Sequence, residues 1–144
     1  MDPIKCFFIE PTGNVETTEL DNGGTRTSPI YRRTDTGEVG KINEFPAGAM
    51  WFATWFENHW NPQLGPDKML VVRTPGGDWI IDSQCSNCGI PDDKNQEKHH
   101  CWILHGTPPN ITVDKNGTTC NAGGGSIQQG NFHGFLRDGY LVDA

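Results

Sequence analysis

The chain has 144 residues, a formal net charge of -7, 34% hydrophobic residues, 18 glycines and 10 prolines. An acidic chain of this length predicts one domain with room for a core, and it lacks the basic patch that nucleic acid or an anionic membrane would attract. The seven Phe and five Trp argue against disorder, and the many turn residues favour a loop-rich β fold.

The N-terminus predicts no secretory signal, because the apolar run over residues 6–9 is too short and Asp2 is acidic. No window approaches the roughly 18 apolar residues of a membrane span. We therefore expect synthesis in the cytoplasm, where thiols stay reduced and clustered cysteines favour a metal over a disulfide.

The first third of the chain predicts two hairpins. A β-type run covers residues 4–10, turn residues at 11–14 break it, and 15–20 could return as the second strand. After a glycine-rich loop, residues 30–33 and 38–42 are expected to pair across an Asp-Thr-Gly turn.

The densest aromatic segment covers residues 45–56. Its period-two pattern favours a strand, although the four-residue spacing of Trp51 and Trp55 leaves a short helix open. We expect the tryptophans to lie in the core or to anchor an interface: Trp51, Trp55, Trp60, Trp79 and Trp102. If exposed, they could stack on sugar rings or fill a pocket of a partner.

The second half predicts further short strands around tight turns. The clearest hairpin joins residues 69–73 to 79–82 through a Pro-Gly-Gly turn. A short strand follows at 101–105. Two more hairpins are expected, one from 111–114 to 118–120 and one from 132–136 to 140–142.

These elements predict a single β-rich domain over residues 1–144. The expected fold class is all-β, with a β-rich α+β fold as the alternative. The architecture would be a small sandwich or barrel of short hairpins with long loops. A Cys/His cluster would brace the loop region at about 83–121.

The candidate metal ligands are four of the five cysteines: Cys85, Cys88, Cys101 and Cys120. A Cys-x-x-Cys step lets two thiolates face one tetrahedral ion from a single turn, and two further ligands must come from a distant segment. Histidines in the same region are alternative ligands: His99, His100 and His105. The pattern predicts structural zinc, which supplies about 10–16 kcal/mol of apparent binding free energy.

Two other interpretations of the cysteines stay open. A disulfide, for example between Cys88 and Cys101, would contribute about 3 kcal/mol and needs an oxidising compartment. Alternatively, the thiols are separate buried groups that act as small hydrophobes. Cys6 has no neighbour in the sequence and is expected in the core.

No catalytic signature stands out. Glu97 near His99 could serve a zinc-bound water, and Cys101 with His133 could form a nucleophile and base, but neither has a supporting motif. The glycine tract at 123–125 lacks the lysine of a phosphate-binding loop. The sequence therefore favours a non-enzymatic chain over an enzyme without deciding between them, and no catalytic or cofactor-binding residue is assigned.

Several strings carry a resemblance to a known group: CFFIEPTG, YRRTDTGE, PAGAMW, GGDWIIDSQCSNC, HHCWILHGTPPNITVDKNGTTC, GSIQ and FHGFLRDG. Over nearly its whole length the chain resembles small uncharacterised proteins encoded by tailed phages and prophages. That group has no assigned activity, so no catalytic residues can be carried over from it, and the resemblance implies only an origin in a bacterial virus. It also implies that the position of Cys85 is often not Cys, in which case a histidine would join Cys88, Cys101 and Cys120.

These observations predict a virion accessory protein, either a capsid decoration or a head-tail component, which docks on the phage coat or another virion protein. It would be made in the host cytoplasm and then reside in the virion, with self-association left open. A cytoplasmic effector that binds and inhibits a host or defence protein is the first alternative. A small zinc-dependent enzyme is the second.

Overall fold

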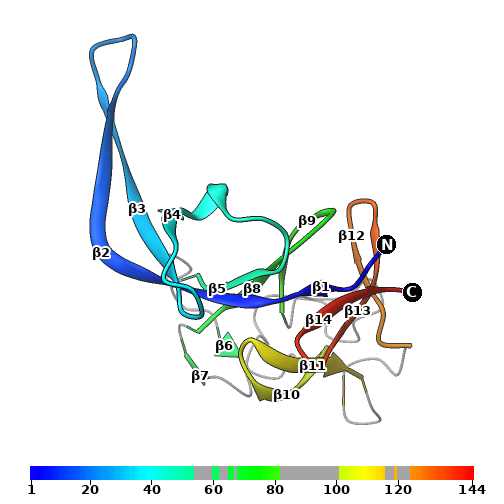
Figure 1. The fold of residues 1–144 in the computed structure, drawn as a ribbon. Coiled ribbons are helices and arrows are strands. Elements are labelled where there is room, and N and C mark those ends of the chain that lie inside the picture. The colour runs from blue at the N-terminus through cyan, green and yellow to red at the C-terminus, as the bar shows by residue number, and fades with distance from the viewer. Residues whose placement is uncertain (54–59, 62–64, 67, 82–100, 116–118, 120–123) are drawn as a thin grey trace.

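The computed structural model describes residues 1–53, 60–61, 65–66, 68–81, 101–115, 119 and 124–144. Its strands form two six-stranded sheets and one separate strand pair (Figure 1). The described residues contain no α-helix, only a 3-10 turn, η1, over Ile42–Glu44. The prediction of an all-β chain is therefore confirmed.

One sheet carries both chain ends and has the order β1-β14-β13-β11-β10, with β12 also paired to β13. Its strands are β1 (Ile4–Lys5), β10 (Ile103–Thr107), β11 (Asn110–Asp114), β12 (Ile127–Gln129), β13 (Phe132–Arg137) and β14 (Tyr140–Asp143). All the pairings are antiparallel. The N-terminal amine also forms an ion pair with the Asp143 carboxylate, and this pair joins the two ends of the chain.

The other sheet has the order β4-β3-β2-β5-β8-β9. Its strands are β2 (Phe7–Glu19), β3 (Thr25–Arg33), β4 (Val39–Lys41), β5 (Ala49–Phe52), β8 (Leu70–Thr74) and β9 (Gly77–Ile80). Only β2 and β5 run parallel, through Phe7 and Phe8. The separate pair consists of β6 (Trp60–Asn61) and β7 (Gly65–Pro66).

The main core combines side chains from both sheets, so the sheets pack face to face. Met50, Leu70 and Val72 come from one sheet, and Leu136 and Leu141 from the other. All five are completely buried. Burying such a side chain contributes about 1.5–3 kcal/mol.

A second cluster covers the opposite face of the β2-β5-β8 sheet, with Phe45 and the partly buried Ile42 laid over it. Arg73 holds this cover in place. Its Nη1 donates to the carbonyl oxygens of Ile42 at 2.7 Å and Phe45 at 2.8 Å, and its guanidinium pairs with Asp78. Residues from η1 to Phe45 therefore form a lid over one side of the sheet.

The predicted break at residues 11–14 is wrong. β2 continues through it to Glu19 and pairs with β3, whose start at Thr25 precedes the predicted one. The reason is that a register shift between Pro11 and Val15 absorbs the turn-type residues as a bulge inside a continuous strand.

The other predicted hairpins are confirmed where the two strands follow each other closely in the sequence. β8 pairs with β9, β13 with β14, and β3 with β4, as predicted. β11 pairs instead with β10 and β13, and of its predicted return strand over 118–120 only Thr119 is described. β12 was not predicted. Within the described chain, no helix is long and apolar enough to span a membrane.

Candidate functional site

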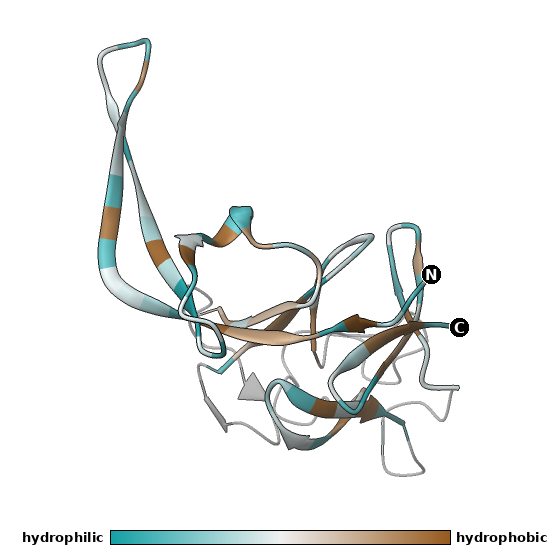
Figure 2. Ribbon diagram, viewed as in Figure 1, coloured by the Kyte–Doolittle hydropathy of each residue, from teal (hydrophilic) through white to brown (hydrophobic). Residues whose placement is uncertain are grey.

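The outer parts of β2 and β3 form a two-stranded arm that projects from the body (Figure 1). We use "the arm" for residues 11–29. Five antiparallel residue pairs, from Val15↔Pro29 to Glu19↔Thr25, hold its outer part together. Residues 13–27 are all exposed. Hydrophilic and neutral colours cover most of the arm, with a few isolated apolar bands (Figure 2).

The base of the arm is defined by the bulge. Gly13 has a φ of 86°, a conformation that other residues avoid. The Thr12 hydroxyl donates to the Ile30 carbonyl at 2.8 Å and the Asn14 N–H donates back to that hydroxyl at 3.1 Å. These bonds replace ladder contacts, and bulges of this kind bend a ribbon away from its parent sheet.

Aromatic and ionic contacts anchor the inner end of β3 to the body. The Arg33 guanidinium lies 3.7 Å from the centroid of the Phe7 ring and makes two hydrogen bonds with Asp35, of 2.9 and 2.8 Å. The hydrogen bond from Arg33 holds the pKa of Asp35 below its ordinary value. Tyr31 is buried in the second cluster, and burial raises its pKa. The arm therefore extends from a rigid base.

The hydrogen-bond register shows which backbone groups of the arm remain open. The Leu20 N–H donates to the Gly24 carbonyl at 2.8 Å. In an antiparallel ladder, N–H and C=O groups face the partner strand at every second residue, so Thr18 and Glu16 also face β3. The residues of β2 between them direct both groups away from β3: Val15, Thr17 and Glu19.

The same alternation applies to β3, where Thr25, Thr27 and Pro29 direct their backbone groups away from β2. β4 pairs with β3 only at residues 30–32. A proline lies near the base on each edge, Pro11 on β2 and Pro29 on β3, and proline cannot donate to a further strand. The arm is thus protected against edge pairing near the body and open farther out.

β2 and β3, whose outer parts form the arm, carry opposite charge over their full lengths. The charged residues of β2 are all acidic: Glu10, Glu16 and Glu19. Those of β3 are all basic: Arg26, Arg32 and Arg33. Near the body the strands neutralise each other through Arg32 and Glu10, whose atoms approach to 3.1 Å. Farther out, the Arg26 side chain has no ion pair with any described residue.

A recess of about 400 Å³ lies between the arm and residues 41–43, and residues of both strands of the arm line it. Its lining comes from both: Thr18, Leu20, Arg26, Thr27, Ser28, Pro29, Lys41, Ile42 and Asn43. Lys41 also approaches Glu16 to 3.8 Å. β4 ends at Lys41, so the recess lies where a further strand could continue along the open edge of β3.

The predicted metal ligands are only partly within the described chain. Cys101 is completely buried in the main core, the same cluster that contains Cys6. His105 is exposed, with its Nε2 2.9 Å from Asp114 Oδ1. The other predicted ligands lie outside the described residues: Cys85, Cys88, His99, His100 and Cys120. Among the described residues, no group of three or more His, Cys, Asp or Glu could hold a metal ion.

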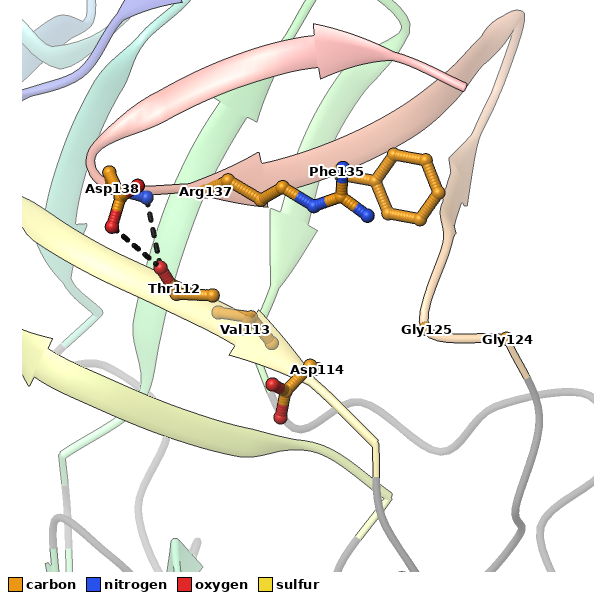
Figure 3. A pocket seen from close by; sticks show the side chains of 8 residues that line it. All are labelled: Thr112, Val113, Asp114, Gly124, Gly125, Phe135, Arg137 and Asp138. Carbon is orange, nitrogen blue, oxygen red and sulfur yellow. Dashed lines mark hydrogen bonds between the residues drawn. The ribbon is translucent and has the colours of Figure 1, made fainter.

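A second pocket, of about 340 Å³, opens between β11, β13 and the glycine segment at 124–125 (Figure 3). Arg137 lies over the Phe135 ring, 3.9 Å from its centroid. The Asp138 N–H donates to the Thr112 hydroxyl at 2.9 Å, and Asp114 stands on the neighbouring strand. One cation stacked on a ring, with two carboxylates also in the lining, makes this a mixed-charge surface without an evident nucleophile.

A serine and a histidine do approach each other nearby, with Ser126 Oγ 3.1 Å from His133 Nε2. Such a contact could activate a nucleophile if a third group oriented the imidazole. His133 is exposed, whereas its predicted partner Cys101 is buried in the core. The described residues therefore do not assemble the predicted Cys101 and His133 pair.

Three of the predicted core tryptophans are confirmed, since Trp51, Trp79 and Trp102 are buried. Trp79 and Trp102 meet edge to face, with ring centroids 5.1 Å apart. Trp55 and the side chain of Trp60 lie outside the described part of the structure.

In comparisons with known proteins, no family model, no curated protein and no solved structure matches the chain.

The arm was the feature that sequence reasoning missed. Its signals were the repeated β-branched residues over 15–27 and the Asp-Asn-Gly-Gly turn at 21–24.

Proposed function

We propose that the chain is a non-enzymatic binding protein encoded by a phage, and that it acts as a virion accessory protein in a capsid-decoration or head-tail role. In this proposal the body is a small β-sandwich, with a Cys/His cluster bracing its long loops. The arm is the element that docks on a repeated protein surface of the particle.

The observation that carries the proposal is an ordered arm with little packing of its own. Ordering the backbone costs about 1–2 kcal/mol per residue. In the five outer pairs this entropy loss is offset mainly by exposed hydrogen bonds, each of which contributes only about 0.5–1.5 kcal/mol net. A two-stranded ribbon alone is marginally stable in water. A partner that covers the arm would supply the missing apolar and backbone contacts.

The geometry of the base supports the same role. The Arg33, Phe7 and Asp35 contacts hold the inner end of the arm on the body, so the outer end can reach a neighbour without a flexible hinge. Five residue pairs at about 3.3 Å per residue give a contact length of roughly 17 Å. The resemblance to small phage proteins supports a particle as the place where this contact is made.

The test is quantitative mass spectrometry of purified particles from the phage or prophage that encodes the chain. The expected result is the protein at a fixed ratio to a coat or tail component. In the arm-shortened variant, residues 17–27 are replaced by Asn-Gly. The Glu16↔Ser28 pair then flanks a two-residue turn that suits an antiparallel ribbon. This variant should fold and be lost from particles.

The matched control is His133→Ala, which removes the Ser126 contact and leaves the arm unchanged. It should be incorporated like the wild type. Absence of the wild-type protein from particles would overturn the virion role. Retrieval of one host protein from infected cells, dependent on the arm, would then support the inhibitor alternative.

A further inference from the structure

We propose that the arm binds the arm of a second copy of this chain, with the acidic β2 edge of one copy pairing with the basic β3 edge of the next. This inference deepens the proposed function, on which it rests only for the arm being the docking element. It names the partner of the arm and the backbone groups that make the contact.

Open backbone groups are the first argument. Among the described residues, Val15, Thr17 and Glu19 present a row of N–H and C=O groups without backbone partners on one edge, and Thr25 and Thr27 present another. Open edges of this kind readily accept a further strand. The prolines near the body, Pro11 and Pro29, confine any such pairing to the outer part of the arm.

Charge complementarity identifies the occupant. An added strand beside β3 meets Arg26 and Lys41, which line the recess. An added strand beside β2 meets Glu16 and Glu19. The acidic edge of one copy is therefore complementary to the basic edge of another, and cross-strand pairs of opposite charge are favourable. A partner of a single charge would suit only one of the two edges.

Side-chain type agrees with intermolecular sheet formation. The outer arm contains Val15, Thr17, Thr18, Thr25 and Thr27, all β-branched residues that favour extended backbone. An incoming strand therefore meets a preformed template, and less ordering entropy remains to be lost on binding.

The geometry also sets the type of assembly. If β2 of the second copy runs antiparallel to β3 of the first, the two arms point the same way. The contact is head-to-tail, because different edges meet, so it closes into a ring or continues as a filament. Arms on one side of a ring would form a continuous ribbon.

The first test uses sedimentation equilibrium of the purified full-length chain over a wide concentration range at low and high salt. The wild type should self-associate, more weakly at high salt, since exposed charges are screened. Thr17→Pro and Thr27→Pro each remove one outward N–H without touching the β2-β3 hydrogen bonds, and each should be monomeric. Circular dichroism checks that both variants fold.

The second test exchanges the charges. Glu16→Lys with Glu19→Lys makes both edges basic, and Arg26→Glu with Lys41→Glu makes both edges acidic. Each variant alone should associate about tenfold more weakly than the wild type. An equimolar mixture of the two should recover association, because every contact then joins a basic edge to an acidic one.

A wild type that stays monomeric at every concentration, or a mixture that fails to recover, would overturn the inference. Failure here is separable from failure of the proposed function. A monomeric chain that enters particles through its arm keeps the virion role and places another protein on the arm. A chain that self-associates through its arm but is absent from particles keeps the inference and loses the role.

Discussion

The contact between the β8-β9 turn and the β12-β13 turn gives the sharpest stability prediction. A Cβ atom added at Gly76 would lie 1.9 Å from the Gln129 carbonyl oxygen and 2.8 Å from the Phe132 nitrogen. Both are backbone atoms, so no side-chain rotation can relieve the overlap. Gly76→Ala must therefore separate the two sheets where they meet.

Overpacking of this kind costs about 1–3 kcal/mol, and the upper end applies because two backbone segments must move. In a domain of about 150 residues, each kcal/mol changes Tm by about 2–4 °C. We expect Gly76→Ala to lower the free energy of unfolding by about 3 kcal/mol and to lower Tm by roughly 6–12 °C.

The assay is urea unfolding followed by tryptophan fluorescence, with thermal melting as a second probe. Gly124→Ala is the matched control, because no described atom lies within 4 Å of the added Cβ. Its stability should stay within about 0.5 kcal/mol of the wild type. If Gly76→Ala behaved like this control, the close approach of the two sheets would be refuted.

Three further predictions concern ionisation and metal. Burial raises the pKa of Cys6 to about 12, so thiol reagents at mildly alkaline pH should label Cys6 only after unfolding; rapid labelling of the folded protein would contradict its place in the core. The hydrogen bond from Arg33 lowers the pKa of Asp35 below 3.8, so its stabilisation is present above that pH and lost as pH falls through the folded value. Asp35→Asn should therefore be less sensitive to acid below about pH 4 than the wild type, as acid titration followed by circular dichroism would show. If zinc is bound through Cys101 and the predicted ligands, metal analysis should find one ion per chain and chelation should lower Tm; unchanged melting after both chelation and reduction would remove metal and disulfide alike.

Turns with strong local chemistry were predictable. Pro75-Gly76 joins β8 to β9, and Asp138-Gly139 joins β13 to β14, because the residues that allow a tight turn lie between two β-favouring runs. The same reasoning failed at residues 11–14. There the proline and glycine serve a bulge, and the true turn of the hairpin is at 21–24.

For the candidate site, the sequence showed the parts of the arm but not their arrangement. Acidic residues in one run and basic residues in another are visible along the chain. That they form the two edges of one projecting ribbon depends on pairing Val15 with Pro29, which local patterns do not specify. The predicted metal ligands lie mostly outside the described residues, so the zinc prediction remains a proposal.

By itself the sequence determined the strand character of the chain and the tight turns at 75–76 and 138–139, because these follow from residue type and near neighbours. It favoured the core for the tryptophans, and the structure confirms burial of Trp51, Trp79 and Trp102. Only the tertiary structure decided that β2 runs parallel to β5, that β11 joins β10 and β13, and that the arm leaves the body. Those pairings unite segments far apart in sequence, and they are selected by the core that the two sheets build together.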